Sequence, residues 1–146
     1  MIINAEGHIL GRLSAFAAKH ALLGENVIIV NAEKLLVSGD RNAVFKKYMS
    51  RLEWKNKMNY TKGPFHQKRP DKFVRKAIRG MLPYKKTRGR EAYKRVMVYI
   101  GIPEYEIKNV HNIDIKNQEI QNLNNIKKEV RGVTVDEICK FIGGNW

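Results

Sequence analysis

The chain has 146 residues, of which 43% are hydrophobic, a length and composition that favour one globular domain over a disordered chain. Its formal net charge at pH 7 is +14, and such an excess destabilises a compact protein unless an anionic partner neutralises it. The single cysteine excludes an internal disulfide, and no apolar run reaches the roughly 18 residues of a membrane-spanning helix.

The N-terminal part of the chain predicts two strands and one helix between them. A short strand at 2–4 precedes a helix at 10–23, whose apolar residues cover a broad arc and which Gly24 can terminate. The segment NVIIVN at 26–31 is a continuous apolar run, which is typical of a central strand covered on both faces. We therefore expect the helix to pack against a sheet whose central strand is buried.

Strands and helices continue to alternate further along the chain. We predict strands at 35–39 and 97–100, and between them a helix that Asp40 caps and that extends to Trp54. Strands that alternate with helices indicate an α/β architecture around a small, mostly parallel sheet, here of about four strands.

The C-terminal part of the chain contains one segment without a clear pattern, at 106–128, and one clear helix start after it. Six asparagines between 106 and 128 favour turns, so we expect a chain that wraps over the body there without regular elements. Beyond this segment, Thr134 and Glu137 have the spacing of a capping box, and Gly143 can end the helix that they begin.

An amphipathic helix is predicted in the middle of the chain, beginning at Pro70 and ending before Pro83. Its apolar residues share one arc and can dock on the body while the opposite, basic arc faces outward. Gly80 is unfavourable in a helix interior by about 1 kcal/mol relative to alanine, so packing must hold this helix. We expect Gly89 to let the chain turn again. The basic arc comprises Lys72, Arg75, Lys76 and Arg79.

Positive charge is concentrated around this helix. Residues 41–95 contain 19 basic and only 3 acidic side chains, whereas the rest of the chain is slightly acidic. A surface evolved only for solubility would intersperse both signs. An anionic membrane surface is the main alternative partner, but the sequence contains no long amphipathic basic helix. The asymmetry therefore favours nucleic acid as the partner.

We predict that the loop–helix–loop region 55–95, within a single domain 1–146, binds RNA. Arginine can hold a phosphate through two hydrogen bonds, and lysine acts as a point charge. The rings of Phe65 and His66 can stack on unpaired bases, although Phe65 could equally pin its loop to the core. The predicted RNA-binding residues are Lys57, Lys62, Phe65, His66, Lys68, Arg69, Lys72, Arg75, Arg79, Lys85, Lys86, Arg88, Arg90, Lys94 and Arg95.

Several segments together resemble a known family. They are HILGRLSAFAAKHALLG, VIIVNAEKLLVSG, GPFHQKRP, RGMLPYKKTRGREAYKRVMVYIGIP and GGNW, in this order. The chain resembles the universal large-subunit ribosomal protein thirteen family, in its archaeal and eukaryotic branch, because GIPEYE stands where the bacterial branch usually carries a His-Pro-His block. The resemblance implies a three-layer α/β/α sandwich that binds large-subunit ribosomal RNA, beside neighbouring ribosomal proteins, and stabilises its folding and assembly. It also implies a cytoplasmic location and no small-molecule substrate.

Two other functions stay open: a basic RNA-processing enzyme and an RNA-binding regulator that acts away from the ribosome. The GHILG segment lacks the ending of a P-loop, and the carboxylates at 53, 71 and 91 are scattered among cations. The four histidines have no metal-ligand spacing, and Cys139 fits a small buried hydrophobe. We therefore predict no catalytic residue, no metal and no cofactor.

The loop at 55–69 contains too little apolar surface to pack by itself. We expect its backbone amides to exchange rapidly in the free protein and to become protected when RNA binds. Hydrogen exchange with and without RNA measures this, and strong protection of the loop in the free protein would contradict the prediction.

Overall fold

The computed structural model describes residues 1–113, 120–121, 123 and 130–146. Most of the segment that we expected to wrap over the body lies outside these residues. The elements are Ile2–Asn4 (β1), Leu10–Leu23 (α1), Val27–Val30 (β2), Ala32–Lys34 (η1), Leu36–Ser38 (β3), Arg41–Glu53 (α2), Tyr60–Lys62 (η2), Pro70–Met81 (α3), Thr87–Lys94 (α4), Val96–Val98 (β4), Glu104–His111 (α5), Gly132–Thr134 (β5) and Val135–Phe141 (α6).

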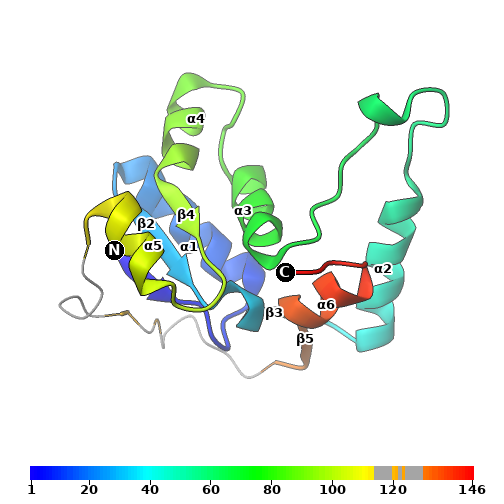
Figure 1. The fold of residues 1–146 in the computed structure, drawn as a ribbon, viewed down its shortest axis with the longest axis horizontal. Coiled ribbons are helices and arrows are strands. Elements are labelled where there is room, and N and C mark those ends of the chain that lie inside the picture. The colour runs from blue at the N-terminus through cyan, green and yellow to red at the C-terminus, as the bar shows by residue number, and fades with distance from the viewer. Residues whose placement is uncertain (114–119, 122, 124–129) are drawn as a thin grey trace.

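A parallel three-stranded sheet lies between two helical layers (Figure 1). The strand order is β1-β2-β4, with Ile28 opposite both Ile2 and Met97. Residues of α1 and α3 pack on one face of the sheet, and Ile107 of α5 packs on the other. The predicted α/β class is therefore confirmed, with helices on both faces of a small, mostly parallel sheet.

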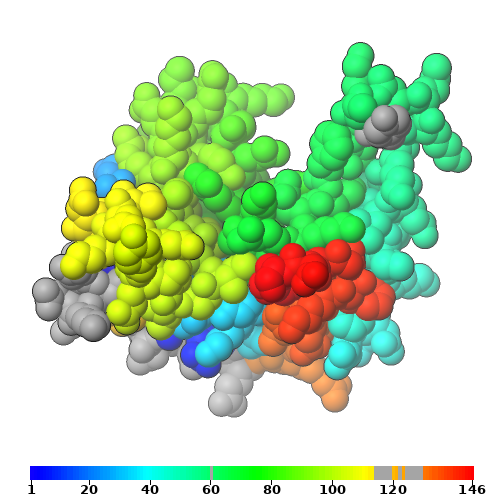
Figure 2. Space-filling model, in the orientation of Figure 1, coloured from blue at the N-terminus to red at the C-terminus, as the bar shows by residue number. Residues whose placement is uncertain are grey.

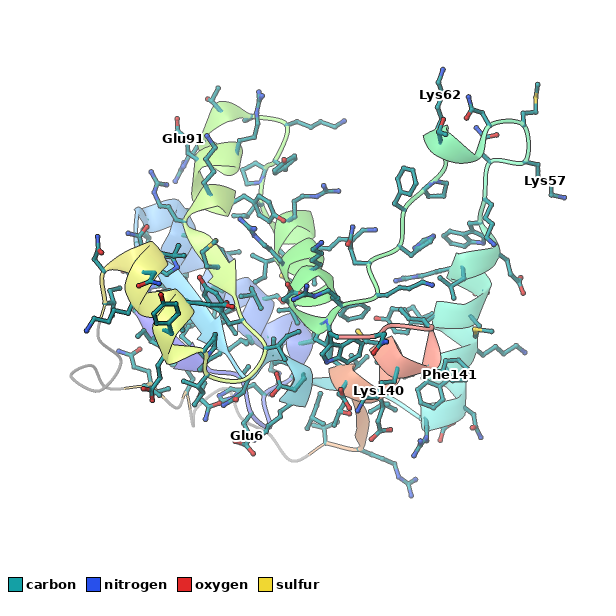
Figure 3. The ribbon with its side chains drawn as sticks, in the orientation of Figure 1. Glu6, Lys57, Lys62, Glu91, Lys140 and Phe141 are labelled. Carbon is teal, nitrogen blue, oxygen red and sulfur yellow. The ribbon has the colours of Figure 1, made fainter. Side chains whose placement is uncertain are left out.

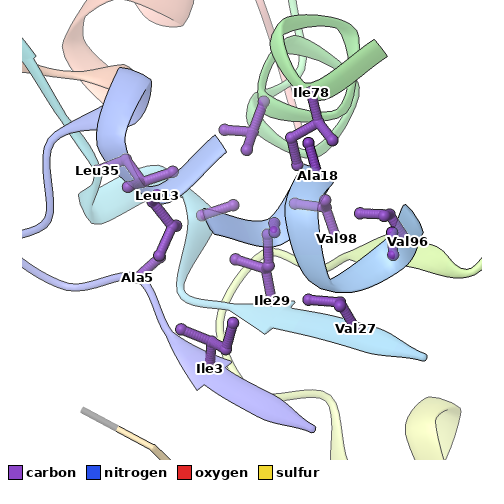
Figure 4. Packing of buried hydrophobic residues seen from close by; sticks show 14 of the residues in the cluster. Ile3, Ala5, Leu13, Ala18, Val27, Ile29, Leu35, Ile78, Val96 and Val98 are labelled. Carbon is purple, nitrogen blue, oxygen red and sulfur yellow. The ribbon is translucent and has the colours of Figure 1, made fainter. Parts of the chain in front are cut away.

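The central strand β2 is buried on both faces, as its apolar run predicted. Val27 and Ile29 belong to the large core under α1 and α3 (Figure 4). Ile28 and Val30 face the opposite way and belong to a smaller cluster with Ile107. Side chains alternate between the two faces of a strand, so both faces require apolar residues here.

The third predicted strand, β3, does not join the parallel sheet. It pairs antiparallel with β5, with Leu36 opposite Thr134 and Ser38 opposite Gly132. Only residues 31–35 connect β2 to β3, whereas parallel neighbours need a crossover of about a dozen residues or more. The short connection therefore carries β3 to the edge of the body, where β5 meets it.

The predicted helix ends match the structure closely. Gly24 ends α1 with a φ of 104°, a left-handed conformation that suits glycine. The Asp40 side chain accepts hydrogen bonds from the backbone nitrogens of Asn42 and Ala43 at 3.1 and 3.4 Å. At the start of α6, Thr134 Oγ1 accepts from the Glu137 nitrogen at 3.2 Å.

Two helices are present where we expected turns or loops. In α5, acidic residues occupy the first turn, Lys108 and His111 lie in the last turn, and Ile107 is fully buried. This charge order suits the helix dipole and outweighs the asparagines nearby. In α4, Gly89 is a buried helical residue rather than a turn, and its missing side chain lets α4 pass close to the backbone of Pro83.

We predict opposite effects of alanine at two glycines of neighbouring helices. A Cβ atom at Gly89 would lie 2.1 Å from the Pro83 carbonyl oxygen, so Gly89→Ala should lower the free energy of unfolding by about 1–3 kcal/mol or more. Nothing lies within 4 Å of a Cβ atom at Gly80, so Gly80→Ala should raise it by up to about 1 kcal/mol. Urea denaturation measures both, and equal behaviour of the two variants would refute the close approach at Gly89.

Candidate nucleic-acid interface

The orientation of α3 is set by its buried stripe. Val74 and Ile78 are fully buried in the core shared with α1 and the sheet. Pro70 occupies the first turn, where its missing N–H costs nothing. As the sequence predicted, the basic arc of α3 therefore faces away from the body, with Lys72, Lys76 and Arg79 exposed and Arg75 half-buried.

A groove of about 560 Å³ runs along this basic arc, and we call it the basic groove. The loop between α2 and α3 forms one side of it, and Tyr93 of α4 contributes to the other. Figure 2 shows the hollow between the two projections that this loop and α4 make from the body. The lining residues are Pro64, Phe65, Gln67, Lys72, Arg75, Lys76, Arg79 and Tyr93.

Two tyrosines hold two arginines of the groove region in place. The Arg75 guanidinium lies 4.6 Å from the ring centre of Tyr93, and that of Arg79 lies 5.1 Å from the ring centre of Tyr84. The two tyrosine rings meet edge to face at 5.4 Å. Each cation–π contact contributes about 0.5–1 kcal/mol at an exposed site, enough to orient a guanidinium before a ligand arrives.

Sequence reasoning missed these tyrosines and Lys76 as parts of the site. The sequence does contain a pattern that is typical of RNA-binding surfaces, because Tyr84 and Tyr93 are interleaved with cations in PYKKTRGREAYKR. The pairing of Tyr84 with Arg79 and of Tyr93 with Arg75 depends on how the chain returns from α3 to α4, which the pattern does not contain.

The loop between α2 and α3 extends outward and carries predicted site residues at its tip. Lys57 and Lys62 lie at the end of the loop farthest from the body (Figure 3). Phe65 is 66% exposed, so the interpretation of Phe65 as a core contact is wrong. Lys76 of α3 fastens the base of the loop, because its Nζ donates to the Phe65 carbonyl at 3.0 Å.

The segment from the end of α3 through α4 supplies a second group of cations. Glu91, the acid within this group, lies on the side of α4 away from the loop (Figure 3). Arg95 is half-buried, and its Nη1 donates to the Ala21 carbonyl in the last turn of α1 at 3.4 Å. One donor of Arg95 is therefore used within the fold. The exposed cations are Lys85, Lys86, Arg88, Arg90 and Lys94.

The protein's own acids leave most of these cations unneutralised. Within the described part of the chain, Arg69 is the one predicted site residue that forms an ion pair, with Arg69 Nε 3.3 Å from Asp71 Oδ1. The other ion pairs of the described residues, Arg41 with Glu137 among them, lie outside residues 55–95. The positive charge around the basic groove is therefore available to an external anion.

His66 and Lys68 lie at the base of the loop, near the C-terminal segment. His66 is half-buried, and burial lowers its pKa, with Lys76 and Arg51 adding to the effect. The ring is therefore neutral near pH 7. Lys68 lies against the C-terminus, because its Nζ would be 3.6 Å from a Cβ atom at Gly143.

Histidine, cysteine and carboxylate side chains are absent from the described lining of the basic groove. Across the described residues, no group of three or more histidine, cysteine, aspartate or glutamate side chains is placed to hold a metal. The thiol of Cys139 is buried, as predicted, and burial raises its pKa to about 12. In the same part of the chain, no helix has the length and apolar character required to cross a membrane.

Comparison with known proteins identifies the family. The model of the family described as Ribosomal protein L13 matches residues 1–105, which include the basic groove. A large ribosomal subunit protein uL13 from Methanococcus maripaludis is 40% identical over 147 residues, covering 100% of this chain and 99% of that protein. The proteins of the same name from Methanocaldococcus jannaschii and Archaeoglobus fulgidus are 40% and 37% identical, and cover 99% and 97% of this chain. The chain belongs to the ribosomal protein L13 family.

Proposed function

We propose that this chain is a structural component of the large ribosomal subunit, in the cytoplasm, that binds large-subunit ribosomal RNA. Relatives that match this chain over nearly their full length are named as large-subunit proteins. The observation that carries the RNA contact is the basic groove, bordered by two cationic projections that the protein's own acids do not neutralise. In this role the protein contributes to folding and assembly of the RNA beside neighbouring ribosomal proteins.

The mechanism is electrostatic and geometric. Cations that approach the RNA backbone release condensed counterions, which favours binding without reading sequence. The rigid sandwich fixes the spacing between the loop, the basic arc of α3 and α4, so RNA segments that contact all three are held in one relative position. Arg75 and Arg79 are already oriented by Tyr93 and Tyr84, so less conformational entropy is lost on binding.

This role is structural rather than catalytic, and two measurements separate it from the alternatives. Incubation with labelled RNA and a divalent metal yields cleaved product only for an RNA-processing enzyme. Sedimentation of large subunits at high salt retains an integral component, whereas a regulator that acts away from the ribosome is lost from the particle.

We predict a steep dependence of RNA affinity on salt. If about 6–10 phosphates are contacted, the affinity for large-subunit RNA should fall about 10³–10⁵-fold between 50 and 200 mM monovalent salt. Filter binding over this range measures the slope. A nearly flat slope would show that charge does not dominate the interface.

Reversal of three exposed cations should separate binding from folding. Lys85→Glu, Lys86→Glu and Arg88→Glu together should weaken RNA binding by more than about tenfold. They should also reduce the slope of the logarithm of affinity against the logarithm of salt concentration by about 3. Their side chains are exposed, so the melting temperature should change little.

The matched control carries Arg12→Glu, Lys34→Glu and Arg131→Glu, three exposed positions outside the region 55–95 with the same change in net charge. We expect this control to retain most of the affinity. Equal losses in the two triple variants would indicate that net charge, rather than the position of the cations, governs binding.

A further inference from the structure

A second cavity, which we call the His66 pocket, lies beside the basic groove. Its volume is about 230 Å³, and it is enclosed by α1, α2, the base of the loop, α3 and the segment after α6. Two aromatic rings line it, Tyr48 of α2 and Phe73 of α3, with their centres 5.3 Å apart. Leu52 and Ile142 add apolar surface.

Polar side chains also line the His66 pocket, and one of them carries an unpaired buried atom. His66 Nε2 is buried and has no hydrogen-bond partner among the described residues. Buried polar atoms are almost always paired, so an atom of this kind marks a place where a ligand or water binds. Arg51 and Lys76 also line the pocket, and the Arg51 guanidinium lies 5.2 Å from the ring centre of Tyr48.

The His66 pocket adjoins the basic groove. Gln67 and Lys76 line both, and the hydrogen bond from Lys76 to the Phe65 carbonyl lies at their junction. A chain whose phosphates follow the groove can therefore direct one side group into the pocket without leaving the cationic surface.

We propose that the His66 pocket holds one unstacked base of the bound RNA, packed against Tyr48 and Phe73 and hydrogen-bonded to His66. This inference rests on the proposed function and adds to it one enclosed site for a single base. Arg51 and Lys76, which also line the pocket, contact the phosphate of the same nucleotide.

Size and chemistry favour a base over other occupants. The pocket is much larger than the roughly 30 Å³ share of one water, and smaller than the roughly 300–1,000 Å³ of sites for drug-sized ligands. A phosphate ion alone would leave the aromatic and apolar walls unused, whereas every base has a flat face that stacks on such rings. The neutral imidazole of His66 has one donor and one acceptor nitrogen, which suits the edge of an uncharged base.

The test uses large subunits assembled with the full-length chain. Three variants are compared with the wild type: His66→Leu removes the polar atom, Ala77→Phe adds a ring at a lining position, and His111→Leu is the control. His111 is also a half-buried histidine with a pKa lowered by burial, but it lies on α5 and binds the Tyr99 hydroxyl. Sedimentation at high salt first establishes that each protein is incorporated.

Two readouts then report on the base itself. Ultraviolet crosslinking joins a base directly to a side chain that touches it, and mass spectrometry should locate the crosslink on Tyr48, His66 or Phe73. Base-specific probing, with dimethyl sulfate for adenine and cytosine and a carbodiimide for uracil and guanine, should find one base protected in wild-type and His111→Leu subunits. In His66→Leu subunits the same base should become about three- to tenfold more reactive, the effect of one lost hydrogen bond. Ala77→Phe should abolish both the crosslink and the protection.

The outcomes distinguish this inference from the proposed function. Incorporated protein that crosslinks only through rings of the basic groove, such as Phe65 or Tyr93, overturns the base contact and leaves the proposed function intact. A pocket occupied by water or by a free mononucleotide gives no crosslink between the RNA chain and Tyr48, His66 or Phe73. That result also overturns the base contact and leaves the proposed function intact. Failure of the wild-type chain to enter the subunit overturns both.

Discussion

The position of the proposed RNA interface depends on the burial of Val74 and Ile78 in the core between α3, α1 and the sheet. These two side chains determine the rotation of α3 about its axis, and that rotation determines where the basic arc points. Because an α-helix makes one turn every 3.6 residues, the direction of the buried face of α3 determines the direction of the opposite, basic face. The loop before α3 and the turn into α4 are attached to the ends of this helix, so their positions follow from the same contact.

A surface with so many cations must fold before its partner is present. The structure limits self-repulsion by spreading the cations over two projections and the helix between them (Figure 3). Where guanidiniums approach one another, along α3, tyrosine faces lie beside them and provide favourable electrostatic contacts without neutralising the charge. Tyrosines can therefore orient the arginines where carboxylates would have competed with RNA phosphate.

The two hollows beside α3 differ in character in a way that suits a polymer with charged and uncharged parts. Half of the residues that line the basic groove are cations, whereas the His66 pocket has aromatic and apolar walls beside Arg51 and Lys76 and contains one unpaired buried nitrogen. Lys76 lines both hollows and holds the loop that separates them, so a single side chain links the structure of the loop to the shape of the site.

The sequence by itself determined the features that depend on local periodicity and capping. The bounds of α1, the Asp40 and Thr134 caps, the buried run of β2 and the two faces of α3 all follow from residues within a few positions of one another. Tertiary structure decided the rest, because those features depend on residues far apart in the chain. β3 pairs with β5 instead of joining the parallel sheet, and Gly89 lies in a helix that passes close to the Pro83 backbone. The His66 pocket exists only because folding brings α2, the loop, α3 and the C-terminal segment together, and no spacing along the chain encodes that meeting.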